Sequence, residues 1–98
     1  MYMRVQEKGK ETIVALCDKE LVGKVLREGE MVLDLEKYAS FYKGEATEAA
    51  DAARELKAAT SINLVGKRSV ALARKLGLVE KGEIMKIGGV PHVQIYLI

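Results

Sequence analysis

The chain has few of the side chains that usually carry chemistry. Its 98 residues include one histidine, one cysteine and no tryptophan, and aromatic residues make up 5% of the total. A single cysteine excludes an internal disulfide, and one histidine without companion ligands makes no metal centre. Cys17 follows the apolar run Ile13–Leu16, so we expect it to be a buried structural residue. The core must be built from aliphatic side chains.

Long apolar runs are also missing. No segment approaches the roughly 18 residues that a membrane-spanning helix needs, and the first residues lack the charged start and apolar stretch of a secretion signal. We therefore expect a cytoplasmic protein without membrane contact. A chain of 98 residues, 49% of them hydrophobic, can build one hydrophobic core but not two. This predicts a single globular domain over residues 1–98.

Four stretches have the patterns of β-structure. Residues 2–6 alternate between apolar and polar, and residues 11–17 are rich in β-branched side chains and apolar on both faces, as in an interior strand. Residues 24–36 predict a hairpin with a glycine in its loop. Residues 83–98 predict a second hairpin around Gly88–Pro91, where two glycines and a proline favour a reversal.

Two helices are predicted between these hairpins. Residues 45–59 follow a helical period with alanines on one face. Residues 60–77 predict a second helix, with the side-chain oxygens of Thr60–Asn63 at its start and Gly77 after its end. We therefore expect an α+β fold, in which an antiparallel sheet from the N-terminal strands and the C-terminal hairpin carries the pair of helices on one face.

Positive charge is concentrated in the second half of the chain. Residues 1–49 contain 8 Lys/Arg and 10 Asp/Glu, whereas the remaining residues contain 8 and 4, so the net charge changes from −2 to +4. On the second predicted helix, Lys67 and Arg74 lie opposite the apolar face, flanked by Arg68 and Lys75. This pattern favours a surface that faces a polyanion, and the alternative is a solvated face with no partner.

The segment Gly66–Ser69 matches a phosphate-binding loop only in part. The full pattern needs a glycine at position 61 and a serine or threonine at position 68, where the chain has Ser61 and Arg68. We therefore expect no nucleotide-hydrolysing loop. A looser hypothesis is that free amides of residues 63–66, with the two basic residues that follow, hold one phosphate of a larger partner. The serine that ends the segment lies on the apolar side, and we expect its hydroxyl to bond to the helix backbone.

The single histidine, His92, lies in the last predicted strand. A catalytic histidine needs an orienting partner and a pocket, and the sequence identifies neither. We expect a structural role, in which His92 closes the Gly88–Pro91 turn through a hydrogen bond. The alternative is a binding role beside Gln94 and Tyr96.

Aromatic and basic residues are interleaved once, where Tyr38, Phe41 and Tyr42 lie beside Lys37 and Lys43. Proteins that bind single-stranded nucleic acid use such combinations for stacking and phosphate contact. Because aromatic residues are scarce here, we favour the other interpretation, in which Phe41 and one tyrosine cap the core where the first helix crosses the sheet.

Three blocks of sequence, residues 41–45, 60–66 and 87–94, together resemble the archaeal family catalogued as domain of unknown function 424. The resemblance implies a small stand-alone protein associated with the translation apparatus, and it defines no catalytic residue. The resemblance marks a candidate surface that members of the family would share. An equally good explanation is that its glycines and proline form turns and its asparagine caps a helix. Its members are Lys43, Asn63, Gly66, Gly88, Gly89, Pro91, His92 and Gln94.

These observations favour a non-enzymatic binding module that contacts RNA or a ribonucleoprotein, without a cofactor. One alternative is a protein-interaction or homodimeric module that uses the terminal strand or the alanine-rich helix face. The other is an enzyme acting on a small anionic substrate. The candidate nucleic-acid contacts are Lys43, Lys67, Arg68, Arg74 and Lys75. The candidate surface and turn residues are Asn63, Gly88, Gly89, His92 and Gln94.

Overall fold

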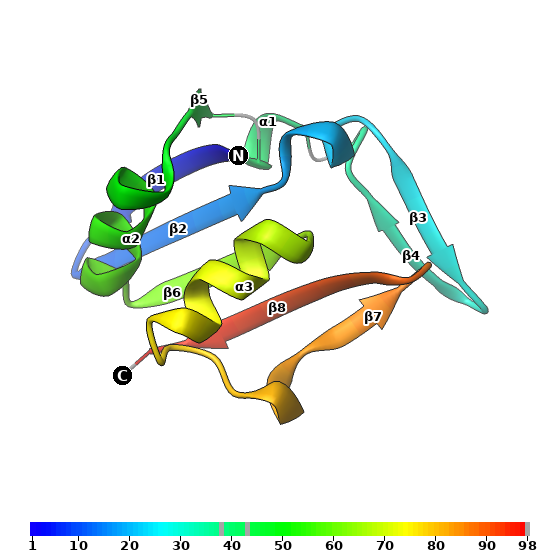
Figure 1. Cartoon of the computed structure of the whole chain (residues 1–98). Coiled ribbons are helices and arrows are strands. Elements are labelled where there is room, and N and C mark those ends of the chain that lie inside the picture. Colours follow the sequence, from blue (N-terminus) through cyan, green and yellow to red (C-terminus); the bar gives the residue numbers. More distant parts are fainter. Residues whose placement is uncertain (38, 43, 98) are drawn as a thin grey trace.

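The computed structural model describes residues 1–37, 39–42 and 44–97. Its largest unit is a six-stranded sheet, which two longer helices cover on one face, and a separate two-stranded hairpin packs against the other face (Figure 1). The α+β class predicted from the sequence is therefore confirmed.

The sheet has the strand order β5-β1-β2-β6-β8-β7. Its strands are β1 (Tyr2–Lys8), β2 (Glu11–Cys17), β5 (Glu45–Ala46), β6 (Ser61–Val65), β7 (Met85–Ile87) and β8 (Val90–Tyr96). All neighbours are antiparallel except β2 and β6, which run parallel. The expected antiparallel sheet thus contains one parallel pair, because the chain between β2 and β6 returns to the start of β2 through α2 (Ala49–Ala58), as parallel pairing requires.

The predicted helix over residues 60–77 is wrong at its start. Residues Ser61–Val65 form β6, an interior strand between β2 and β8, and α3 begins only at Lys67 and ends at Lys75. Ile62 and Leu64 alternate toward the helices and are completely buried, as a period of two requires. The residues expected to cap a helix therefore pair across the sheet.

The two longer helices pack on the face formed by the even-numbered residues of β2. They are α2 (Ala49–Ala58) and α3, and the chain also forms the short helix α1 (Ala39–Tyr42) and the 3-10 turns η1 (Lys19–Leu21) and η2 (Lys81–Glu83). Ala52 and Leu56 of α2 and Val70 and Ala73 of α3 pack with Leu16 in one cluster. The two-helix layer is confirmed, and the small side chains of α2 lie in this core.

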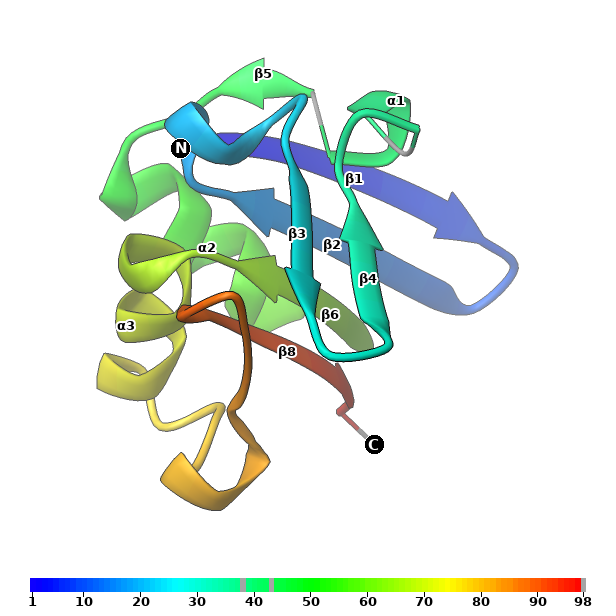
Figure 2. The ribbon, with the colours of Figure 1, turned by 90° about the vertical axis from the view of Figure 1, so that its right-hand side faces the viewer.

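The odd-numbered residues of β2 face the opposite layer. A two-stranded hairpin of β3 (Val25–Glu28) and β4 (Met31–Asp34) crosses the end of the sheet there (Figure 2). Leu26 and Leu33 pack with Cys17 and Val65 in a second cluster. Phe41 joins this cluster, which confirms its predicted place in the core.

The predicted C-terminal hairpin is confirmed, with a shorter loop. Gly88 and Gly89 form the turn between β7 and β8, with φ angles of 57° and 79°. Two consecutive positive φ angles are the geometry of a type I′ hairpin turn, which glycine adopts without strain. Pro91 lies within β8, opposite Lys86. The Gly88 amide donates to Glu28 Oε1 at 3.1 Å, which ties this turn to the hairpin layer.

Candidate functional site

The N-terminus of α3 is held by a buried carboxylate. Asp18, directly after β2, is 2% exposed, and its Oδ2 accepts the Arg68 amide at 3.0 Å. Its Oδ1 accepts both the amide and the hydroxyl of Ser69, each at 2.8 Å. The hypothesis of free amides at residues 63–66 is wrong, because residues 63–65 pair within the sheet and the Gly66 amide donates to the Pro91 carbonyl. At the next two residues of the helix start, the chain supplies its own anion. The Ser69 hydroxyl bonds to this carboxylate instead of the helix backbone.

Gly66 makes this arrangement possible. Its φ of 109° is disfavoured for other residues. A Cβ on Gly66 would lie 2.2 Å from Asp18 Cγ, closer than any real contact. Asp18 was not among the candidates predicted from the sequence, although an acidic residue directly after a buried apolar strand is a signal that could have identified it.

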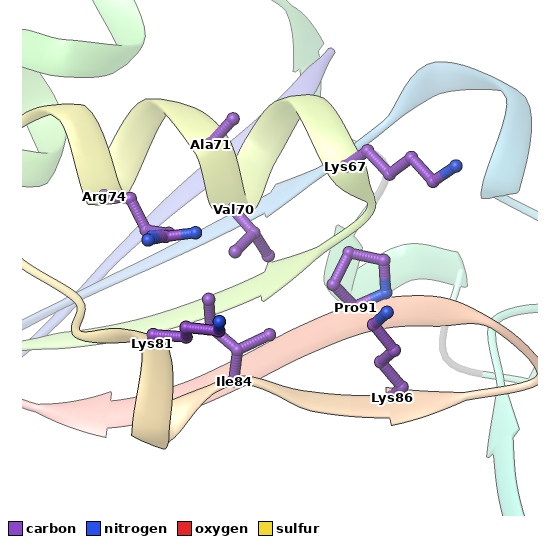
Figure 3. A pocket seen from close by; sticks show the side chains of 8 residues that line it. All are labelled: Lys67, Val70, Ala71, Arg74, Lys81, Ile84, Lys86 and Pro91. Atoms are coloured by element: carbon purple, nitrogen blue, oxygen red, sulfur yellow. The ribbon is translucent and has the colours of Figure 1, made fainter.

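A basic groove lies between α3 and the η2–β7 segment (Figure 3). It is a hollow of about 400 Å³. Two cationic side chains come from the helix and two from the opposite wall, and the remaining lining is aliphatic. The cationic residues of this basic groove are Lys67, Arg74, Lys81 and Lys86, and its apolar residues are Val70, Ala71, Ile84 and Pro91.

Among the residues that the structure describes, no acidic side chain lines the basic groove. All of its cationic residues are exposed, and none of them forms an ion pair within the described residues. Unpaired cations around one concave surface raise the local concentration of anions. Two of them, Lys81 and Lys86, were not selected from sequence, because they lie outside the helical pattern that pointed to Lys67 and Arg74.

The other cationic candidates lie elsewhere. Arg68 lines a neighbouring hollow with Lys67, beside Asp18 and Glu20. Lys75 is exposed on α3 and is not part of the basic groove. The candidate Lys43 and the neighbouring Tyr38 lie outside the described residues.

The polar candidates lie on the opposite face of the sheet. Asn63 in β6 pairs with Ala15 on one side and Gln94 on the other. His92 pairs with Val65 in the adjacent row of the same face. Because side chains alternate along a strand, Pro91 reaches the basic groove while His92 points to the hairpin layer. The structure therefore divides the predicted surface between two faces.

The predicted hydrogen bond of His92 is not made by its Nδ1. This nitrogen is buried and has no hydrogen-bond partner among the described residues, so it does not close the turn. Burial lowers the pKa of His92 below its usual 6.5, which keeps the ring neutral at physiological pH. A neutral imidazole adds no charge to this face.

Cys17 is completely buried, as predicted. Burial raises its pKa to about 12, with a smaller contribution from Asp18, so the thiol is unreactive. In residues 1–37, 39–42 and 44–97, no three His, Cys, Asp or Glu side chains are placed to hold a metal ion. The described helices include none long and apolar enough to cross a membrane.

The chain matches the DUF424 family, described as a protein of unknown function, over residues 5–98. It belongs to this family. A solved structure, the crystal structure of an uncharacterized conserved protein from the archaeon Methanopyrus kandleri, is 30% identical with a TM-score of 0.82. The match covers 98% of this chain and 90% of that chain. No curated protein matches the chain.

Two of the blocks that carry the DUF424 resemblance are neighbours in the fold. Residues 60–66 contain β6, residues 87–94 contain most of β8, and these strands pair along their length. The Gly66 amide donates to the Pro91 carbonyl at 2.9 Å, which joins the start of α3 to the wall of the basic groove. These DUF424 blocks thus build the interior of the sheet and support the site.

Proposed function

We propose that this DUF424 protein is a non-enzymatic module that binds RNA, alone or in a ribonucleoprotein, through the basic groove. The observation that carries this proposal is that four cationic side chains from three elements line one hollow. Within the described residues, these four side chains form no ion pair and no acidic side chain lines the hollow. Lysine and arginine side chains in such an arrangement bind several phosphates together.

The lining of the basic groove supports binding more than catalysis. Besides the cations, it contains only aliphatic side chains and Pro91. None of these residues is a nucleophile paired with a base, as covalent catalysis requires. The aliphatic floor offers a surface for a ribose or a base, while the cations on both walls face the phosphates.

A second candidate is self-association along β8. Strand β7 pairs only with Val90–His92, so the outer edge of β8 beyond His92 has no partner strand within the described sheet. An open edge is a template for strand addition. The alanine-rich face of α2 is less suited, because Ala52 and Leu56 already lie in the core. Elution well above 10.8 kDa in gel filtration would support this candidate.

The RNA proposal is tested by reversing charges inside and outside the basic groove. The test variant is Lys67→Glu with Arg74→Glu. The matched control is Lys57→Glu with Lys10→Glu, which changes the net charge equally at exposed residues that do not line the basic groove. Fluorescence anisotropy with a single-stranded RNA of about 10 nucleotides measures the affinity.

We expect the groove variant to bind RNA about 100-fold more weakly, because two phosphate contacts become repulsive. The control should lose less than about fivefold, since distant charges are screened. An equal loss in both variants would mean that RNA responds only to net charge. An unchanged affinity in the groove variant would refute the proposal.

A further inference from the structure

A second hollow adjoins the basic groove and has a different charge. It measures about 310 Å³ and shares Lys67 with the basic groove. Figure 3 shows the Lys67 side chain extending away from Val70, past the N-terminal end of α3. The lining of the second hollow includes two carboxylates, Asp18 and Glu20, beside Lys67 and Arg68. A ligand that leaves the basic groove past Lys67 therefore meets carboxylates as well as cations.

Only one of these carboxylates is available to a ligand. Both oxygens of Asp18 are occupied by the start of α3. Glu20, in η1, is exposed, and its carboxylate makes no hydrogen bond or ion pair within the described part of the chain. The second hollow thus presents a single free carboxylate next to two cationic side chains.

A free carboxylate selects between parts of an RNA strand. It repels a phosphate, and it accepts hydrogen bonds from hydroxyl groups with both of its oxygens. A carboxylate that holds ribose hydroxyls beside a phosphate site is a common arrangement in nucleotide recognition. In an RNA strand, an unmodified 3′ end is the place where two neighbouring ribose hydroxyls are free and no further phosphate follows.

We propose that the second hollow receives the terminal ribose at the 3′ end of an RNA strand, with Glu20 accepting hydrogen bonds from its 2′- and 3′-hydroxyls. The last phosphates then lie on the cations of the basic groove, and Lys67 lies between the two hollows. This inference rests on the proposed RNA binding and adds the part of the RNA that is recognised. It makes Glu20 a specificity-determining residue.

The test compares RNA ends on one sequence of about 10 nucleotides. One oligonucleotide has a free 3′ end, a second has a 3′-phosphate, and a third lacks the 2′- and 3′-hydroxyls of its last ribose. Binding is measured for the wild-type protein, for Glu20→Gln, and for the control Glu30→Gln in the β3–β4 turn. The wild type should bind the free 3′ end at least about fivefold more tightly than the 3′-phosphate.

Glu20→Gln should lose most of the discrimination against the 3′-phosphate, because its amide keeps a hydrogen-bonding group and removes the repulsive charge. Glu30→Gln should keep the discrimination. Equal wild-type affinity for all three oligonucleotides, with RNA binding still sensitive to Lys67→Glu and Arg74→Glu, would overturn this inference alone. Discrimination that persists in Glu20→Gln would also overturn it. A failure of every oligonucleotide to bind would overturn the proposed function as well.

Discussion

The helix face and the hairpin face of the six-stranded sheet differ in the polar residues that they bring together, although the same strands build both. The helix face carries the basic groove, in which Arg74 and Lys86 approach from opposite walls. The hairpin face presents the neutral pair Asn63 and Gln94, with His92 kept neutral by burial. The candidate surface predicted from the sequence therefore combines residues that lie on opposite faces of the sheet.

The separation follows from strand geometry. In β8 successive side chains alternate, so Pro91 and His92 belong to different layers although they are neighbours in the chain. The second half of the chain has an excess of cations, and four of them line the basic groove on the helix face. This difference indicates that the two faces have different roles, and variants that act on one face at a time can test it.

The largest effect is expected from Gly66→Ala, which loosens α3 from its face of the sheet. The new Cβ would lie 2.2 Å from Asp18 Cγ, and the φ of 109° is strained for alanine. We expect a loss of about 3 kcal/mol or more in the free energy of unfolding, because the clash and the strained backbone act together. Urea denaturation monitored by circular dichroism measures the loss.

Gly82→Ala is the matched control for this substitution. A Cβ on Gly82 would meet nothing within 4 Å, and its φ is not in the left-handed region. We expect no loss of stability, because alanine restricts the unfolded chain without a clash in the folded one. Equal destabilisation by the two substitutions would show that the contact between Gly66 and Asp18 is not what holds the helix.

The second effect concerns the wall of the basic groove opposite α3. Lys81→Gln with Lys86→Gln should weaken RNA binding about tenfold at low salt. It should also reduce the slope of log affinity against log salt by about 1.4, since each phosphate contact with a single strand contributes about 0.7. Anisotropy titrations at several salt concentrations measure both quantities. A slope that stays at the wild-type value would show that this wall does not contact phosphates.

Some elements of the fold were predictable from the sequence and others were not. The hairpins and the interior position of β2 followed from the period of the hydrophobic residues and from turn chemistry. The start of α3 was not predictable in this way, because Thr60–Asn63 is typical both of a helix cap and of a strand that begins with small polar residues. Residues 61–65 form a strand because they pair with β2 and β8, and this long-range pairing is not visible in the local sequence.

The site was predictable only in part, for a similar reason. Helical spacing placed Lys67 and Arg74 on one face, since both lie on α3. Lys81 and Lys86 reach the basic groove through the return of the chain along η2 and β7, and this depends on long-range packing. The bond of Asp18 to Ser69 spans 51 positions of sequence, so no local pattern reports it.

A smaller effect is expected on the hairpin face, where His92 makes the free energy of unfolding depend on pH. Burial lowers the pKa of His92 in the folded chain below 6.5, the value expected when unfolded. The unfolded chain therefore binds more protons between these two values, and the free energy of unfolding falls as the pH drops below 6.5 toward the folded pKa. Above that window the ring is neutral in both states and this dependence disappears.

His92→Leu tests this dependence, because leucine does not titrate and removes the unpartnered Nδ1. We expect the variant to be more stable than the wild type by up to about 1 kcal/mol near neutral pH. The advantage should grow as the pH falls to about 5. Thermal unfolding at several pH values measures this difference. A difference between the two proteins that is constant over the whole range would rule out titration of His92 as the cause.

The smallest effect is expected from Asn63→Ala with Gln94→Ala, which alters the centre of the hairpin face and leaves the basic groove intact. These side chains lie opposite each other across β6 and β8. Because they point away from the basic groove and carry no charge, RNA affinity should change by less than about twofold, and its salt dependence should not change. Anisotropy and salt titrations carried out alongside the groove variants measure both quantities.

A loss comparable to that of Lys67→Glu with Arg74→Glu would mean that RNA reaches around the sheet to both faces. An unchanged affinity would show instead that these two polar side chains are not needed for RNA binding, and it would leave this face available for a separate partner.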